Sequence, residues 1–379
     1  MPENAMITAV VEEATASGRI PGAIVTVRAD GELVHHSAHG SVDHHSASGL
    51  RPDTLLWLAS LSKPFGAVAL LSLVDEGRVR LEDAVSAYLP EFAEPGRVRV
   101  LTPGSPSPFG PPFGPPPDPA PVFDIVPALR ELTLLDLLTY TGGLQSIFMW
   151  NPEYVMPAQG ETLRGYAPKL ARLVRDFQPG QGWAYSNGAS FDVLSRVVEI
   201  ASGQELDEFL AERLFEPMGL RQTGFGCASH AAAQPLAAAL LDNEVIAGRT
   251  FRSTSAGLWS TAHDYLIFAE MLRNGGVHGS RRLLQQETVA RMTTNQVGEL
   301  CTGLNGREPA GGVGFGLGVA VLDDPTAAHE ALPAGSFGWD GVGTRRFWVC
   351  PAAGWSLFYF APDIGVQRDI EAAVARAFA

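Results

Sequence analysis

Strand-like and helix-like patterns of apolar residues occupy different parts of the chain. Alternating runs cover residues 23–28 and 32–39, separated by the hairpin signal Asp30-Gly31. Three further strand-like runs cover residues 316–322, 344–350 and 355–360. Helical spacing, with capping or stop signals, predicts helices over 5–17, 133–139, 162–175, 189–202, 205–216, 261–274 and 365–378. Strands therefore lie at both ends of the chain and helices lie between them.

Residues 64–76 form a helix-like segment that is apolar on almost every side and ends before Gly77. A helix without a polar face is expected to be central and buried. Burial on all sides would hold the residues at its N-terminus rigidly, which suits a reactive side chain.

The simplest assembly is an α+β fold with one antiparallel sheet of five strands, drawn from both ends of the chain and flanked by the first and last helices. Residues 1–90 and 305–379 would form this discontinuous sheet domain, and residues 91–304 a mainly helical domain. Residues 102–127 are too rich in proline and glycine for a helix or a central strand. They are either a domain linker or a long surface loop within a domain, and we favour the loop.

The bulk composition narrows the class of partner. The chain has 379 residues and a formal net charge of −14, which argues against nucleic-acid and anionic-membrane partners. We find no signal-peptide pattern and no apolar run long enough for a membrane span. Three scattered cysteines, Cys227, Cys301 and Cys350, fit reduced thiols better than disulfides. These features predict a cytoplasmic protein.

Five histidines between residues 35 and 45 raise the question of a metal site. Their spacing matches no standard ligand pattern, and no set of cysteines or carboxylates completes it. We therefore expect neither a metal nor an organic cofactor.

Ser60 and Lys63 stand three residues apart just before the apolar helix, so their side chains would share one helical face. A serine hydroxyl needs a base to become a nucleophile, and a buried lysine can serve as that base. Arginine cannot, because it does not lose its proton in proteins. The chain has only two lysines, Lys63 and Lys169. Alone, the spacing is also compatible with a solvated lysine near a helix start.

Two further motifs carry candidate chemistry: Tyr185-Ser186-Asn187, on a loop ahead of a helix, and residues 338–344, at the start of a strand. A phenol beside a lysine ammonium can pass a proton to a leaving alkoxide. The backbone N–H of Ser60 is one candidate donor to an oxyanion. Taken alone, these motifs favour a structural interpretation, with Tyr185 a buried tyrosine at a loop–helix junction and Trp339 a core aromatic.

Together, in this order, the three motifs resemble the serine β-lactamase and penicillin-binding-protein superfamily, most closely its family VIII carboxylesterases. Other stretches typical of the family are residues 52–65, 134–139, 178–180 and 257–261. The resemblance implies a β-lactamase/transpeptidase-like fold, with Ser60 as nucleophile, Lys63 as base and Tyr185 as proton shuttle. It also implies that Asn187 contacts the lysine or the substrate, and that the N–H of Val342 is the second oxyanion donor.

The third motif departs from the wider family. Many members have Lys-Thr-Gly or His-Ser/Thr-Gly where this chain has Trp339-Asp340-Gly341. The esterase branch commonly has Trp-Gly-Gly, so Asp340 is unusual. This chain lacks the positive residue of that motif and carries the acidic Asp340 instead, which should disfavour binding of anionic substrates. The motif therefore indicates neutral esters as substrates. Phe148 and Trp150 are aromatic residues in a predicted loop that either fill the core or line an apolar pocket.

The sequence therefore predicts a serine carboxylesterase that hydrolyses small-molecule esters, short-chain or aromatic, through an acyl-enzyme. Within the superfamily, the alternatives are a β-lactamase, a D-amino-acid peptidase or amidase, and an acyltransferase. A silent binding protein on the same fold is the alternative outside enzymes. The chain contains no Gly-x-Ser-x-Gly elbow and no phosphate-binding loop, so an α/β-hydrolase and a nucleotide-binding enzyme are not supported.

Overall fold

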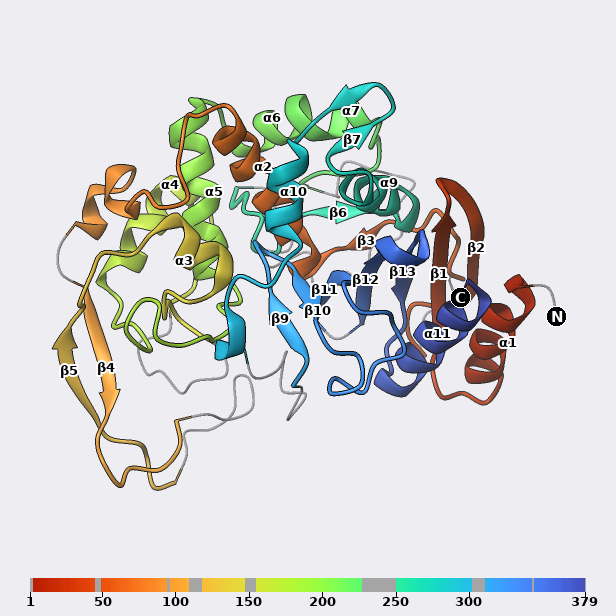
Figure 1. Cartoon of the computed structure of the whole chain (residues 1–379), viewed down its shortest axis with the longest axis horizontal. Helices are drawn as coiled ribbons and strands as arrows, with labels where there is room; N and C mark the ends of the chain where they lie inside the picture. The colour runs from red at the N-terminus through yellow and green to blue at the C-terminus, as the bar shows by residue number, and fades with distance from the viewer. Residues whose placement is uncertain are drawn as a thin grey trace.

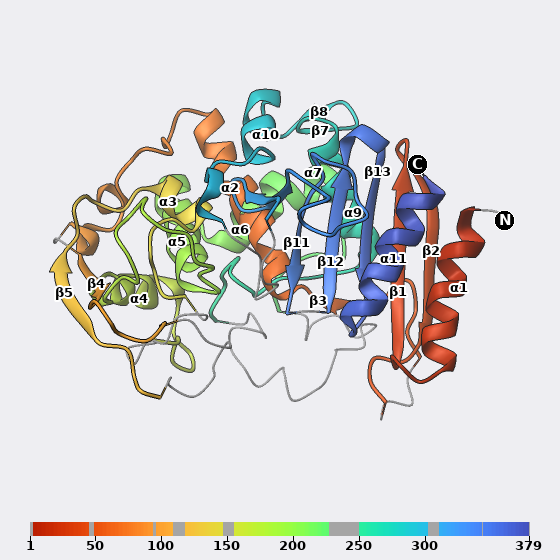
Figure 2. The same cartoon turned by 60° about the horizontal axis from the view of Figure 1, so that its bottom comes forward.

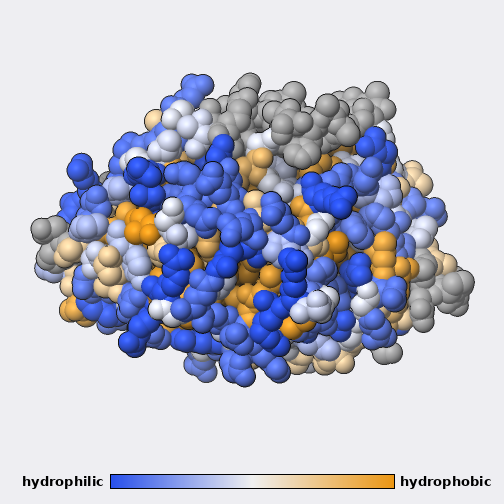
Figure 3. Space-filling model, turned by 90° about the horizontal axis from the view of Figure 1, so that it is seen from above, coloured by the Kyte–Doolittle hydropathy of each residue, from blue (hydrophilic) through white to orange (hydrophobic). Residues whose placement is uncertain are grey.

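The computed structural model describes residues 3–44, 49–93, 96–108, 118–146, 155–226, 250–301, 311–342 and 344–378. A sheet with its covering helices makes up one side of the molecule, and a mainly helical region makes up the other (Figure 1). Hydrophilic side chains cover most of the face seen from above, with apolar atoms in small patches between them (Figure 3). No helix in the described ranges is long and apolar enough to cross a bilayer.

Within the described residues, the main sheet has seven strands in the order β2-β1-β13-β12-β11-β10-β9, and all neighbouring pairs are antiparallel. The strands are β1 (Gly22–Ala29), β2 (Glu32–Gly40), β9 (Val313–Phe315), β10 (Ala320–Leu322), β11 (Phe337–Gly341), β12 (Arg345–Cys350) and β13 (Trp355–Phe360). The two ends of the chain meet where β1 pairs with β13, with Ile24 opposite Phe360. The predicted joining of both ends in one antiparallel sheet is confirmed.

The expected number of strands, five, was wrong. The run at 316–322 breaks at Gly318, whose φ of 84° turns the chain so that Phe315 of β9 pairs with Ala320 of β10. Strand β11 was also hard to foresee, because its two glycines and one aspartate are rare in strands. The third motif therefore forms a strand of its own and the turn after it.

Helices cover both faces of the sheet (Figures 1 and 2). On one face, α1 (Glu3–Ala16) and α11 (Ile364–Ala377) pack side by side. Buried Glu371 of α11 accepts hydrogen bonds from Arg346, Trp348 and Tyr359 of the sheet. On the other face lies α9 (Ala262–Arg273), the helix predicted over 261–274, and the Thr261 side chain caps it by accepting from the backbone N–H of Asp264.

The apolar helix is α2 (Lys63–Asp75), and it is buried from Lys63 to Leu73 as predicted. The remaining helices are α3 (Leu134–Thr139), α4 (Leu163–Tyr166), α5 (Ala189–Ser202), α6 (Leu206–Leu210), α7 (Glu216–Met218) and α10 (Gln286–Met292). The segment predicted as one helix over 162–175 tightens to a 3₁₀ helix from Ala167, next to Pro168, which has no N–H to donate. The segment predicted over 205–216 contains a π-helical stretch over Ala211–Phe215.

Short two-stranded sheets complete the fold. They pair β3 (Leu56–Trp57) with β6 (Trp259–Ser260), β4 (Arg97–Leu101) with β5 (Phe123–Pro127), and β7 (Val277–His278) with β8 (Arg281–Arg282). Because Leu101 pairs with Phe123, the proline-rich stretch starts and ends on neighbouring strands of one hairpin. This arrangement favours an inserted loop over a linker, while the domain boundaries near residues 90 and 305 stay a prediction.

Candidate active site

Ser60 lies in η1, a 3₁₀ turn over Ala59–Ser62 that connects β3 to α2. The turn is held from outside, because the N–H of Leu58 donates to the carbonyl of Leu258 at 2.9 Å. The residue before the serine, Ala59, has a φ of 51°, in the left-handed region that non-glycine residues rarely adopt. Such strain persists only where the surroundings impose it, and it is commonest at functional sites.

Lys63, the first residue of α2, has a fully buried side chain whose amine points at Ser60. Its Nζ lies 3.0 Å from Ser60 Oγ and donates to two backbone carbonyls, of Asn187 at 2.7 Å and Ser255 at 2.5 Å. A neutral amine has two N–H donors and one lone pair. With both donors directed to carbonyls, the lone pair is left for the serine hydroxyl. The contacts therefore suit a lysine that takes a proton from Ser60.

Burial also makes the neutral amine accessible near neutral pH. It lowers the pKa of Lys63 from 10.5 to about 7, against the opposing charges of Asp192 and Asp340. Asp192 is a buried carboxylate on α5, and it accepts a hydrogen bond from Ser253 Oγ at 2.6 Å. Burial raises the pKa of Asp192, whereas hydrogen bonds from Ser253 and Ser255 and the charge of Lys63 lower it. The balance of these charges sets the proton affinity of the amine.

Tyr185 completes the group, as the sequence predicted. It lies in the loop before α5, and its hydroxyl is 2.6 Å from Ser60 Oγ. Its ring packs edge-on against Tyr140 and Trp339, with centroids 5.1 and 5.3 Å away. The hydroxyl of Ser60 and the amine of Lys63, which are close in sequence, thus meet the phenol of Tyr185, 125 residues after the serine, at one oxygen atom. Their chemical roles stay a prediction.

The end of β11 lies directly against the turn that carries the serine. A Cβ added to Gly341 would come within 2.5 Å of the carbonyl oxygen of Leu58, so only glycine allows this approach. Val342, the predicted second oxyanion donor, follows with a φ of 46° and a side chain that is mostly exposed. Gly343, the next residue of the third motif, lies outside the described residues.

The other predicted site residues have mixed outcomes. The backbone carbonyl of Asn187 accepts a hydrogen bond from Lys63, and the implied contact of its side chain with the lysine or the substrate stays a prediction. Trp339 faces Tyr185, but Asp340, one residue on, points to the opposite face of the sheet. There its carboxylate lies 3.6 Å from Arg346, while its charge still raises the pKa of Lys63. The expected effect of Asp340 on anionic substrates stays a prediction. Phe148 and Trp150 lie outside the described residues.

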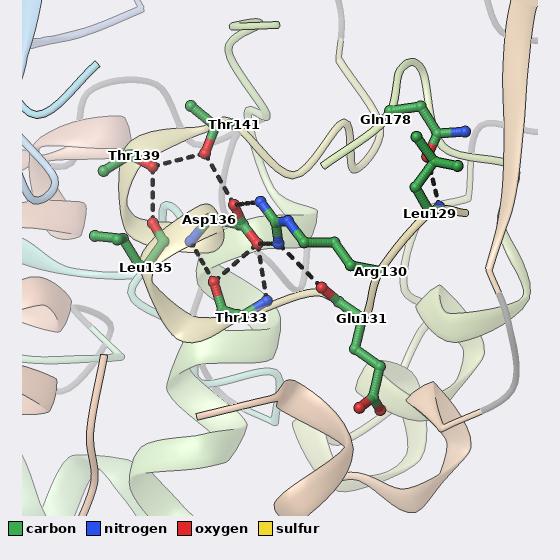
Figure 4. A network of polar contacts seen from close by, with 9 residues as sticks. All are labelled: Leu129, Arg130, Glu131, Thr133, Leu135, Asp136, Thr139, Thr141 and Gln178. Carbon is green, nitrogen blue, oxygen red and sulfur yellow. Dashed lines mark hydrogen bonds and ion pairs between the residues drawn. The ribbon is translucent and has the colours of Figure 1, made fainter. Parts of the chain in front are cut away.

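Sequence patterns did not single out Tyr140, which ends α3 in the left-handed conformation. Figure 4 shows the polar network that fixes this helix. Asp136 pairs with Arg130 at 2.5 and 2.8 Å, accepts from the side chain of Thr133 in a capping box, and accepts from Thr141 Oγ1 at 3.2 Å. The carbonyl of Tyr140 then accepts from the N–H of Ala184 at 3.3 Å. The network thereby ties Tyr140 to the loop that carries Tyr185.

Comparison with known proteins places this chain in a family. The family model described as Beta-lactamase matches residues 7–377, and the chain belongs to that family. Esterase EstB of Burkholderia gladioli is 29% identical over 388 residues, covering 93% of this chain and 88% of that protein. The predicted superfamily resemblance is confirmed.

Two solved structures illustrate the likeness in three dimensions. One is that of EstCE1, described as a hydrolase with promiscuous acyltransferase activity; it has 25% identity and a TM-score of 0.77, and the match covers 98% of each chain. The other is simvastatin synthase LovD of Aspergillus terreus, with 21% identity and a TM-score of 0.76, covering 100% of this chain and 99% of that one. The second likeness concerns the fold alone.

Proposed function

We propose that the protein is a serine carboxylesterase that hydrolyses short-chain or aromatic esters through an acyl-enzyme. The observation that carries the proposal is the position of Ser60 Oγ, 3.0 Å from Lys63 Nζ and 2.6 Å from Tyr185 OH. In this position, the Ser60 hydroxyl has an amine that can take its proton as it attacks the ester, and a phenol that can give a proton to the departing alcohol. We further propose a small-molecule ester as the partner and the cytoplasm as the location.

In the acylation half, Lys63 takes the proton of Ser60 as Oγ attacks the ester carbonyl. The carbonyl oxygen becomes an oxyanion, which the backbone N–H groups of Ser60 and Val342 stabilise. When the C–O bond breaks, the alkoxide takes the proton of Tyr185, and the phenolate takes the proton that Lys63 had accepted. The alcohol leaves, and the acyl group stays on Ser60.

In the deacylation half, a water molecule takes the position of the departed alcohol. Tyr185 passes a proton to Lys63 and accepts one from the water as it attacks the acyl carbonyl. The tetrahedral intermediate then expels Ser60, whose oxygen recovers a proton from Lys63. The carboxylic acid leaves, and all three groups are restored.

The third motif supports esters over β-lactams and peptides. The resemblance implies that Trp339 stands where many members present a cation to the substrate carboxylate, and its ring packs on Tyr185. An indole ring offers an apolar surface there, which suits neutral esters. The esterase name of EstB agrees with this assignment. An acyltransferase would use the same second half-reaction, with an alcohol in place of water as the group that attacks the acyl-enzyme. The description of EstCE1 as a hydrolase with promiscuous acyltransferase activity agrees with this relation.

The test compares a nitrophenyl acetate with a chromogenic cephalosporin and measures labelling by a fluorophosphonate. We expect turnover of the ester to exceed that of the cephalosporin, and both turnover and labelling to disappear in Ser60→Ala. Ser62→Ala is the matched control, because Ser62 Oγ is already engaged by the N–H of Leu258 at 3.1 Å. Preferred cleavage of the cephalosporin, or labelling that survives in Ser60→Ala, would contradict the proposal.

A further inference from the structure

Five aromatic rings form a continuous cluster beside the reactive serine: Tyr140, Trp183, Tyr185, Phe315 and Trp339. Tyr140 lies at the centre, with ring centroids 5.1 Å from Tyr185, 5.0 Å from Phe315 and 6.2 Å from Trp183. Trp339 contacts Tyr185 at 5.3 Å and Phe315 at 5.2 Å. The rings of Tyr140 and Trp339 are almost completely buried, at 1% and 2% exposure.

Three polar atoms of this cluster are buried without a hydrogen-bond partner among the described residues: Tyr140 OH, Trp183 Nε1 and Trp339 Nε1. Buried donors are nearly always paired, so three unpaired donors in one cluster call for an explanation. The fourth polar atom, Tyr185 OH, is paired with Ser60 Oγ at 2.6 Å. Two of the three unpaired donors, Tyr140 OH and Trp339 Nε1, belong to rings that pack against the ring of Tyr185.

The chemistry of these groups defines what would pair with them. An indole N–H only donates, and a phenol hydroxyl can donate, so the complementary group is a hydrogen-bond acceptor. The place follows from the mechanism: Tyr185 gives its proton to the leaving alcohol, and the rings of Tyr140 and Trp339 both lie against Tyr185. The acceptor would belong to the alcohol part of the ester.

We propose that the hydroxyl of Tyr140 and the indole N–H of Trp339 form a subsite for a hydrogen-bond acceptor, such as an ether or keto oxygen, in the alcohol part of the substrate. This inference rests on the proposed esterase function and narrows its substrate class. A purely apolar alcohol would leave the donors unpaired, whereas an alcohol with an acceptor would pair them. Sites of this kind discriminate strongly against analogues that lack the polar atom.

The test uses two acetate esters of equal size, 2-ethoxyethyl acetate and n-pentyl acetate, which differ by one oxygen in place of a CH₂. Both form the same acetyl-enzyme, so kcat/KM reports acylation alone, measured by release of acid. We expect the ethoxyethyl-to-pentyl ratio of kcat/KM to fall about ten-fold from the unaltered protein to Tyr140→Phe. Differences in the intrinsic reactivity of the esters cancel in this comparison. Trp339→Phe provides a second variant with the same expectation.

Tyr166→Phe is the matched control, because Tyr166 OH already donates to the carbonyl of Val155 at 2.9 Å. It should leave the ratio unchanged and lower the midpoint of urea unfolding. Tyr140→Phe should not lower that midpoint, since its hydroxyl has no partner to lose among the described residues.

Either of two results would overturn the subsite: an unchanged ratio in both Tyr140→Phe and Trp339→Phe, or a loss of stability in Tyr140→Phe equal to that of the control. Hydrolysis of neither ester by the unaltered protein would instead remove the proposed esterase function, and this inference with it.

Discussion

Replacing Lys63 with methionine tests whether the buried amine carries the properties that the mechanism needs. Methionine keeps an unbranched apolar stem that ends at the position of Cε, and it removes the titratable amine. In the folded protein, burial lowers the pKa of Lys63 from 10.5 to about 7. That difference corresponds to about 5 kcal/mol, the amount by which keeping the amine charged in its buried site weakens the native state.

The pH dependence of stability follows from this difference. Between pH 7 and 10.5, the unfolded chain retains a proton on Lys63 that the folded chain has released. Stability rises with pH wherever the unfolded state binds more protons, here by about 1.4 kcal/mol per pH unit. Lys63→Met lacks this contribution. Between pH 7 and 10, the free energy of unfolding of the unaltered protein should therefore rise by about 4 kcal/mol relative to that of Lys63→Met.

Urea unfolding of both proteins at several pH values from 6.5 to 10 measures the effect. The variant also leaves the carbonyls of Asn187 and Ser255 without their donor, but this cost is the same at every pH and does not alter the slope. Lys169→Met is the control, since Lys169 is the only other lysine and its side chain is half exposed. If the difference in unfolding free energy between Lys63→Met and the unaltered protein does not change with pH, the amine is charged in the native state and the proposed base is wrong.

Four further substitutions test individual parts of the site. Lys63→Arg keeps the charge but should abolish ester turnover, and near-normal rates would exclude the lysine as base. Tyr185→Phe should lower kcat by about 10²-fold, while an unchanged kcat would remove the phenol from the mechanism. The rate constant kcat/KM should rise with pH through about 7 as Lys63 loses its proton. Asp192→Asn should move this rise to lower pH, because the negative charge of Asp192 raises the pKa of Lys63. A rise at an unchanged pH would show that the charge of Asp192 does not affect the lysine. Gly341→Ala should lower both kcat and thermal stability, since its Cβ would meet Leu58 at 2.5 Å; a variant like the unaltered protein would refute that contact.

Most of the fold could be predicted from local patterns, and the exceptions have local physical reasons. Helices with clear periodicity or caps, such as the one that follows Thr261, form where expected. The strand around Trp339 was missed because glycine and aspartate weaken the strand signal, although sheet neighbours on both sides impose an extended conformation. The 3₁₀ stretch beside Pro168 shows the reverse case, in which one residue overrides a helical pattern.

Ser60, Lys63 and Tyr185 could be predicted as a group, because their residue types and their order in the chain are specific. The residues that surround these three could not be predicted. The charge of Asp192 acts on Lys63 only through the packing of α5 against α2, and no spacing in the sequence indicates that the two residues are near each other. The carbonyls of Asn187 and Ser255 act through the backbone, which every residue shares, so side-chain identity carried no signal for them. The direction of the Asp340 side chain could not be predicted, because it depends on strand alternation in a strand that was not foreseen.

The contact between Gly341 and Leu58 has a practical meaning for anyone who wishes to redesign the substrate range. Two backbone segments of the chain are in contact there. This side of the site therefore has no side chain that could be shortened and no space for a larger one. Libraries aimed at new substrates would do better to vary the bordering rings of Tyr140 and Trp339, and to leave the glycine as a fixed point of the scaffold.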